Sequence, residues 1–260
     1  MLYKSAPTQT QLWVDCPKPR EGSSVKLVCL PHAGAGPRAL YPWVDELPED
    51  IELLPVCLAG RGPRMDEPLA GRVCDIVEPL ARAVAPLMDD TVVFFGHSLG
   101  ALLAFELTLE LRRRKLRQPQ LLVVSGRTAP GADRKLKLHT LPDRHLVREV
   151  QRIYGGIPRE ILVEPAMLKR TLPILRADLA VNETHLDRRE DPLACSVLAL
   201  GGTEDPHVTG TELELWGTRT RGDFDHAQFD GGHFYLSSPE GRSWVIQKTV
   251  HAIRGLGTRR

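Results

Sequence analysis

Residues 91–100 read TVVFFGHSLG, and residues 101–111 continue with ALLAFELTLEL. The first part is rich in β-branched and aromatic residues, which favours a buried strand, whereas the leucine, alanine and glutamate that follow favour a helix. A Gly-x-Ser-x-Gly turn between strand and helix exposes a serine hydroxyl above a parallel sheet. Ser98 is therefore the candidate nucleophile, and this stretch predicts an α/β fold.

Further short apolar runs surround this stretch, with helix-like segments between them. They cover residues 25–30, 52–58, 120–125 and 196–200, and a last strand is expected over residues 224–229. These runs are continuously apolar, which is typical of strands that are covered on both faces. The sequence predicts a doubly wound, mostly parallel central sheet flanked by helices.

The stretch between residues 125 and 196 is the longest interval between predicted strands. It contains helix-like segments over residues 144–153 and 165–179, interrupted by Gly155, Gly156 and three prolines. Open α/β sheets bind ligands at the carboxyl ends of their strands. We expect residues 1–260 to form a single domain, with residues 127–191 inserted as a helical lid subdomain; a purely structural helical layer is the alternative.

A carboxylate is needed to orient the base that activates the serine, because a serine hydroxyl alone is a poor nucleophile. In folds with this turn, the acid and then the histidine follow the serine along the chain. Asp205 lies in the loop after the strand at residues 196–200. The adjacent Glu204 is the alternative, but the tight turn closed by Pro206 is expected to direct it elsewhere.

The catalytic base is expected among the four histidines that follow this acid, which are His207, His226, His233 and His251. His207 follows Asp205 too closely to bridge it to the serine, His226 lies inside the last strand, and His251 lies in the terminal helix. His233 lies on the loop after the last strand, where it can reach back over the sheet. His233 is the predicted base, and a structural loop histidine is the alternative.

An oxyanion hole requires backbone N–H groups that point to the developing negative charge. One is expected from Leu99, directly after the nucleophile. The other is expected from Ala33, because residues 31–36 read PHAGAG after the first strand and their small side chains let the backbone approach a substrate. A dinucleotide phosphate loop is the rival interpretation, but the further glycine and the later acidic residue of that fingerprint are missing.

The composition excludes several classes of protein. The 260 residues carry 34 Lys and Arg against 33 Asp and Glu, a net charge of +1, so no global field favours nucleic acid. Five cysteines, without a C-x-x-C spacing, suggest neither a zinc site nor a disulfide framework. We see no membrane span and no secretory signal, so we expect a cytoplasmic protein with no metal or cofactor.

Taken together, these motifs resemble the type II thioesterases of modular polyketide and nonribosomal peptide synthases, and the related thioesterase of animal fatty acid synthesis. The likeness covers nearly the whole chain and rests on the segments LPHAGAG with Tyr41 and Trp43, LAGRGPR, FFGHSLG, VSGRTAP, LPILRAD, GGTEDP and GGHFYL. Two departures are LAGRGPR, where these proteins usually have a proline-glycine-arginine run, and Tyr154, where leucine is common.

This resemblance implies an α/β-hydrolase fold with a mobile lid over an acyl chamber. It assigns Ser98 as nucleophile, His233 as base, Asp205 as the orienting acid, and the N–H groups of Ala33 and Leu99 as the oxyanion hole. His32 and Tyr154 are expected to contact substrate, and Tyr154 could change the acyl preference. The implied reaction is hydrolysis of acyl thioesters on the phosphopantetheine arm of acyl or peptidyl carrier proteins, by a monomer.

Three other functions are compatible with parts of the sequence. A malonyl-type acyltransferase also carries GHSLG, but Ala101 and Val123 stand where it needs a glutamate and an arginine. A carboxylesterase or lipase would use the same triad, and a non-catalytic binding module would be expected to have lost one triad member. For a carrier protein, a basic rim around the chamber mouth is expected from the loop residues Arg61, Arg64, Arg127, Arg134, Lys135 and Lys137.

Overall fold

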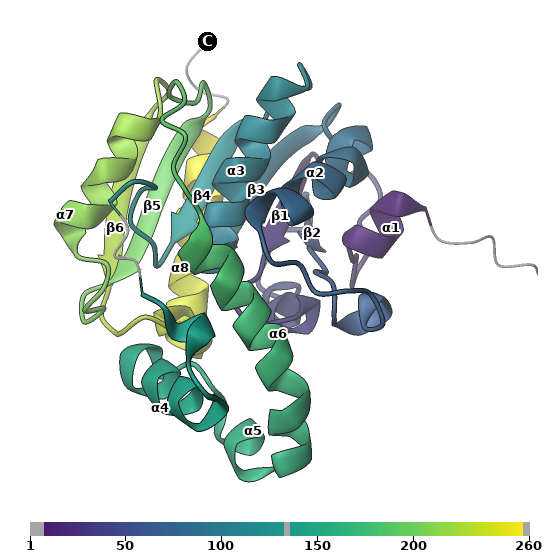
Figure 1. Ribbon diagram of the computed structural model, residues 1–260. Coiled ribbons are helices and arrows are strands. Elements are labelled where there is room, and N and C mark those ends of the chain that lie inside the picture. The colour runs from purple at the N-terminus through teal and green to yellow at the C-terminus, as the bar shows by residue number, and fades with distance from the viewer. Residues whose placement is uncertain (1–7, 133–135, 257–260) are drawn as a thin grey trace, which may run out of the picture.

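The structure is a computed structural model that describes residues 8–132 and 136–256. Within these residues, six strands form one sheet in which every neighbouring pair is parallel. The sheet order is β2-β1-β3-β4-β5-β6 (Figure 1). The strands are β1 (Val25–Leu30), β2 (Ile51–Pro55), β3 (Thr91–His97), β4 (Leu121–Ser125), β5 (Ser196–Gly202) and β6 (Phe224–Phe229). The predicted α/β fold with a parallel sheet is confirmed.

Strand β2 differs from its prediction, because it ends at Pro55 instead of continuing to residue 58. Val56 still donates its backbone N–H to the carbonyl of Cys29 on β1 at 2.8 Å, so the missing N–H of Pro55 does not interrupt the hydrogen bonding to β1. Val56 also pairs in an isolated antiparallel bridge with Val14, and Cys57 donates its N–H to the carbonyl of Trp13, so from here the chain follows the N-terminal segment and not β1. The apolar residues beyond Pro55 are buried in the core without belonging to the sheet.

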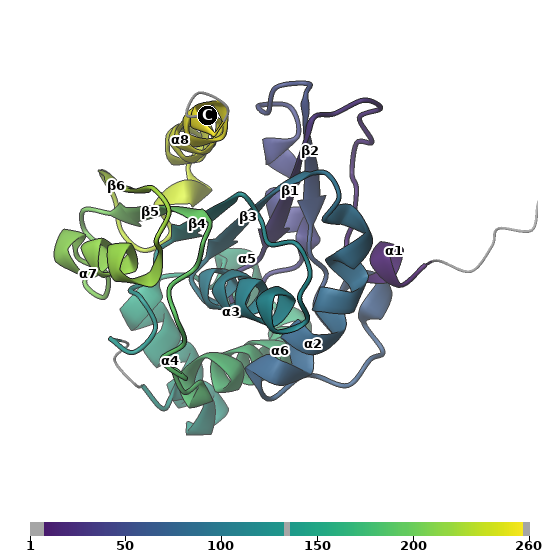
Figure 2. The same ribbon diagram turned by 90° about the horizontal axis from the view of Figure 1, so that it is seen from above.

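Helices cover both faces of the sheet (Figure 2). The helices α2 (Val73–Val84), α3 (Leu99–Arg113) and α7 (Gly210–Glu214) pack on one face, and α8 (Pro239–Gly255) and the 3-10 helix η1 (Pro37–Trp43) pack on the other. Successive strand residues point to opposite faces. Accordingly, Phe94 lies in the core under α3, whereas Phe95 lies in the core under α8.

Smaller elements complete the parts of the chain that pack on the sheet. They are the N-terminal helix α1 (Gln9–Trp13) and the 3-10 turns η2 (Gly62–Arg64), η3 (Ala85–Leu87), η5 (Leu215–Arg219) and η6 (Tyr235–Ser237). Trp13 of α1 is buried in the same core as α2. No helix in the described ranges is long and apolar enough to cross a lipid bilayer.

The chain between β4 and β5 forms a group of helices beyond one edge of the sheet (Figure 1). It contains η4 (Leu138–Thr140), α4 (Asp143–Tyr154), α5 (Arg159–Val163) and α6 (Pro165–Thr184). Helices α4 and α6 were predicted, and α5 was not. Helix α4 ends at Gly155, whose φ of 64° is the left-handed conformation common at helix ends. A separate apolar cluster joins these helices, with Leu146, Leu172 and Leu179 among its members.

Candidate active site

The turn from β3 to α3 holds Ser98 in a strained conformation, with φ 56° and ψ −114°. Its backbone N–H donates to the carbonyl of Ser125 on β4 at 2.8 Å. A Cβ on Gly96 would lie 2.1 Å from the carbonyl oxygen of Gly100, and a Cβ on Gly100 would lie 2.1 Å from that of Leu30. The two glycines are therefore required for the close packing of β1, the turn and α3, and this packing holds the serine above the sheet.

Three side chains from distant parts of the chain meet at this turn. The Ser98 hydroxyl lies 3.1 Å from His233 Nε2, and His233 Nδ1 lies 2.6 Å from Asp205 Oδ2. The side chains of His233 and Asp205 are buried. With His233 placed between Ser98 and Asp205, its Nδ1–H donates to the Asp205 carboxylate, and its Nε2 is left free to accept the proton of the Ser98 hydroxyl. The arrangement can thus raise the nucleophilicity of the Ser98 hydroxyl.

Asp205, and not Glu204, contacts the histidine. The second oxygen of Asp205, Oδ1, accepts the backbone N–H of His207 at 2.9 Å, so both oxygens of the buried carboxylate are engaged. Glu204 is exposed on the same loop. Of the other candidate histidines, His226 lies on β6 and His251 lies in α8, whereas His207 lines a pocket together with Ser98 and His233.

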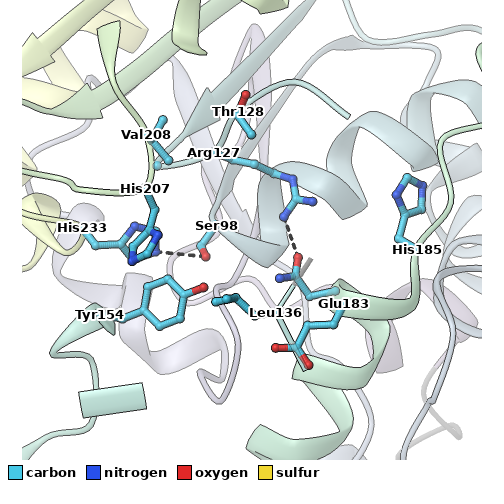
Figure 3. Close-up of a pocket in the computed structure, with 12 residues that line it drawn as sticks. Ser98, Arg127, Thr128, Leu136, Tyr154, Glu183, His185, His207, Val208 and His233 are labelled. Carbon is cyan, nitrogen blue, oxygen red and sulfur yellow. Dashed lines mark hydrogen bonds between the residues drawn. The ribbon is translucent and has the colours of Figure 1, made fainter. Parts of the chain in front are cut away.

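A pocket surrounds Ser98 and His233 and contains the other predicted site residues except Asp205. Ala33 and Leu99, the two predicted oxyanion donors, line it, as do His32 and Tyr154. Asn182 is a polar member of the remaining wall. The rest is apolar and is made mainly by the helices beyond the sheet and by Phe234, with Val150, Ile157, Leu175 and Leu179. The Tyr154 ring centroid lies 4.9 Å from that of His233, so this tyrosine covers the base directly (Figure 3).

Two further histidines lie next to the base and are held neutral. Burial, followed by the positive charges of His233 and Arg61, lowers the pKa of His32 to about 4. Burial holds the pKa of His97 well below its usual range, and the His97 ring centroid lies 5.1 Å from that of His233. Neutral neighbours do not repel the positive charge that His233 gains when it accepts a proton.

A hydrogen-bonded chain beneath the site orients His97. Its Nδ1 lies 2.9 Å from the hydroxyl of Ser125, which lies 2.6 Å from the hydroxyl of Tyr235. Burial raises the pKa of Tyr235, so this phenol keeps its proton. Gly126 is required beside this chain, because its φ is 59° and a Cβ there would lie 2.4 Å from the His97 ring.

The predicted basic rim is wrong for three of its members, because their guanidinium groups point inward. Arg61 forms a buried ion pair with Asp178. Arg64 pairs with Glu67, donates to the carbonyl of Cys57, and stacks on the Trp13 ring. Arg127 donates to Asn182 inside the pocket (Figure 3). Buried charges of this kind need partners, and these arginines have them.

The other predicted members of the basic rim are Arg134, Lys135 and Lys137. Lys137 is exposed. Arg134 and Lys135 lie outside the described residues. In the ranges that the structure describes, no group of three or more His, Cys, Asp or Glu side chains could hold a metal ion.

The site contains one feature that the motifs did not reveal, which is the buried pair of Arg61 and Asp178. Both residues belong to segments singled out in the sequence, LAGRGPR and LPILRAD, but their positions differ by 117. No local pattern connects residues so far apart. The packing of α6 against the loops at the carboxyl edge of the sheet brings them together.

The comparisons with known proteins agree over most of the chain. The thioesterase domain family matches residues 25–253. Thioesterase PikA5 of Streptomyces venezuelae is 37% identical over 227 residues, which are 87% of this chain and 80% of that protein. The RedJ thioesterase of the prodiginine pathway in Streptomyces coelicolor superposes with a TM-score of 0.84 at 35% identity, covering 89% of this chain and 91% of RedJ.

A further solved structure, the type II thioesterase BorB of the borrelidin biosynthetic cluster, has a TM-score of 0.81 at 30% identity and covers 94% of this chain and 97% of its own. The parallel sheet, the strained serine turn and these neighbours define an enzyme of the α/β-hydrolase class. The chain belongs to the thioesterase domain family, among the type II thioesterases of polyketide and nonribosomal peptide pathways.

Proposed function

We propose that this thioesterase hydrolyses acyl groups from the phosphopantetheine thiol of acyl or peptidyl carrier proteins, through an acyl-enzyme on Ser98. The observation that carries the proposal is the chain of contacts from Ser98 Oγ to His233 Nε2 at 3.1 Å and from His233 Nδ1 to Asp205 Oδ2 at 2.6 Å. It lies within a chain that matches thioesterases over residues 25–253.

Acylation begins when His233 Nε2 takes the proton of the Ser98 hydroxyl and Oγ attacks the thioester carbonyl. Asp205 stabilises the imidazolium that forms and holds its Nδ1–H in place. The tetrahedral intermediate collapses, the C–S bond breaks, and the leaving thiolate takes the proton from His233. The acyl group is then bound to Ser98 as an ester.

Deacylation repeats these steps with water. His233 removes a proton from water, the hydroxide attacks the acyl carbonyl, and the C–O bond to Ser98 breaks as the proton returns to Oγ. In both halves the carbonyl oxygen becomes negative, and the N–H groups of Ala33 and Leu99 are the proposed donors to it. The amino end of α3, which begins at Leu99, also favours negative charge there.

The helices between β4 and β5 are the proposed lid over the acyl group. Support comes from the pocket wall, in which Val150 and Tyr154 of α4 and Leu175 and Leu179 of α6 face the site of Ser98. We also propose a monomer that works in the cytoplasm. The five cysteines, none of which is in a disulfide, suit a reducing compartment.

The test compares the rates at which the enzyme hydrolyses the same acyl group from three leaving groups: the thiol of a phosphopantetheinylated carrier protein, a small thiol and an alcohol. The proposal expects the carrier-bound thioester to have the highest kcat/KM, and it expects Ser98→Ala to reduce all three rates to background. A fluorophosphonate should label Ser98 in the unaltered enzyme. Preference for the oxygen ester would identify a carboxylesterase instead, and failure to label a folded sample would indicate a binding module.

A further inference from the structure

The loop that carries Ala33 is held from one side by a helix of the proposed lid. Asp178 of α6 is buried, and its Oδ2 accepts the backbone N–H of Gly34 at 2.7 Å. The same carboxylate accepts two hydrogen bonds from Arg61, at 2.8 Å to Oδ1 and 2.9 Å to Oδ2. One carboxylate therefore ties α6 to two separate loops.

Arg61 adds a second connection to the same loop, one residue further along the chain. Its Nη1 donates to the carbonyl of Ala35 at 2.7 Å, and its Nε donates to the carbonyl of Ala59 at 3.2 Å. Gly34 itself has a φ of 81°, and a Cβ there would lie 3.4 Å from Leu175 of α6. The two residues that follow Ala33 are thus bound by groups that belong to one buried ion pair.

This bracing acts on the peptide groups next to the proposed oxyanion donor. A peptide group is planar, so an acceptor on the Gly34 N–H fixes the plane of the Ala33–Gly34 peptide, and a donor on the Ala35 carbonyl fixes a peptide further along. The His32–Ala33 peptide, which carries the Ala33 N–H, is tied to the same turn, because the His32 carbonyl accepts the N–H of Ala35 at 3.1 Å. The direction of the Ala33 N–H then depends on Asp178 and Arg61 through Gly34 and Ala35.

We propose that Asp178 and Arg61 are positioning residues that hold the Ala33 N–H in the oxyanion hole. The inference rests on the proposed acyl transfer at Ser98, and it adds that α6 supplies part of the support for catalysis. If α6 moves away from the sheet, the Gly34 N–H loses its acceptor and Arg61 loses its counter-charge. The hole is then complete only while this helix is docked.

The test measures transition-state binding separately from substrate binding. We would determine kcat, KM and the inhibition constant of an acyl trifluoromethyl ketone, which forms a tetrahedral adduct with the serine. A misplacement of about 1 Å costs on the order of 100-fold in rate. For Asp178→Ala we expect kcat to fall by about this factor, the inhibition constant to rise by about the same factor, and KM to change by less than about threefold.

Asp178→Asn should have a smaller effect on the same quantities. Its amide oxygen can still accept the Gly34 N–H, but Arg61 is left without a counter-charge. Glu52→Gln is the matched control, because Glu52 is a buried carboxylate whose Oε2 lies 2.7 Å from Lys26 Nζ, away from the pocket. We expect this control to lower stability while the inhibition constant, measured per active enzyme after fluorophosphonate titration, stays unchanged.

A double variant, Arg61→Met with Asp178→Leu, separates positioning from stability. Replacing a buried ion pair by apolar side chains of similar volume is often neutral or stabilising, because no unpaired charge remains. We expect this variant to melt near the temperature of the unaltered protein and yet to keep the low kcat and the raised inhibition constant.

A double variant with unaltered kcat and inhibition constant would overturn the proposal. It would also be overturned if Asp178→Ala changed only the melting temperature and the fraction of active enzyme. The ratios of kcat and of the inhibition constant between each variant and the unaltered enzyme can be measured with any ester or thioester that the unaltered enzyme hydrolyses. Failure of the carrier-protein substrate would therefore reject the proposed function without deciding the role of Asp178.

Discussion

Replacement of Asp205 by asparagine removes one charge while keeping the shape of the side chain. In the native site Oδ1 accepts the His207 N–H at 2.9 Å and Oδ2 lies 2.6 Å from His233 Nδ1. An amide nitrogen facing the His207 N–H would oppose two donors, so the asparagine oxygen must stay on that side. Its NH2 group then faces His233 Nδ1.

This orientation reverses the protonation of the base. A donor opposite Nδ1 requires Nδ1 to accept, which moves the imidazole proton to Nε2, the atom that faces Ser98 at 3.1 Å. A protonated Nε2 cannot take the serine proton. In the serine-protease triad, the corresponding exchange lowers kcat by about 10⁴, which is about 5 kcal/mol of transition-state stabilisation, and we expect a loss of that order.

The assay is steady-state hydrolysis of an acyl thioester by Asp205→Asn, with fluorophosphonate labelling as a second measure of serine reactivity. Glu204→Gln is the matched control, because Glu204 is the exposed neighbouring carboxylate. We expect the control to retain kcat within about twofold, as surface substitutions usually do. The reasoning is refuted if Asp205→Asn stays within about tenfold of the unaltered enzyme, or if Glu204→Gln is equally damaging.

Three further predictions concern the serine turn, His32 and the pocket wall. Gly100→Ala should lower the free energy of unfolding by about 3 kcal/mol in urea titration, because its Cβ would lie 2.1 Å from the Leu30 carbonyl; Gly71→Ala, with open space around its Cβ, should change it by less than about 0.5 kcal/mol. His32 has a folded pKa of about 4 against 6.5 for the ordinary group, so its stabilisation is complete above pH 6.5 and is lost as the pH falls toward 4. This contribution to the free energy of unfolding is about 3 kcal/mol, so on acidification His32→Leu should lose about 3 kcal/mol less stability than the unaltered protein. Equal losses in the two proteins would contradict the assignment. Tyr154→Ala should raise kcat/KM for long acyl chains relative to short ones by about tenfold or more, and an unchanged ratio would show that Tyr154 does not limit the pocket.

The parts of the fold that follow local rules could be predicted from the sequence. The strand, the glycine-flanked Ser98 and the helix after it form one continuous stretch, so their pattern is complete within residues 91–111. Asp205 and His233 could be proposed because loops that follow parallel strands meet at the same edge of the sheet. Strand β2 was predicted too long, because an apolar run indicates burial and not strand pairing: residues 56–58 are buried but lie outside the strand.

The buried arginines show where sequence reasoning stops. Arg61 and Arg64 lie in a glycine- and proline-containing loop, which usually indicates an exposed position, but Asp178 and Glu67 neutralise them and the loop folds inward. Asp178 lies on α6, and its partners Gly34 and Arg61 come from two loops much earlier in the chain. Only the packing of α6 against these loops defines the contacts of Asp178.

The central claim is that the acyl group passes through Ser98. The most direct measurement is rapid quenching of the enzyme during turnover of an acyl-carrier thioester, followed by mass spectrometry of the peptide that contains residues 96–100. The account predicts that the acyl mass appears on Ser98 within the first turnover and that it is absent in Ser98→Ala. Full turnover without acylation of Ser98, or an acyl group found on a different residue, would contradict it.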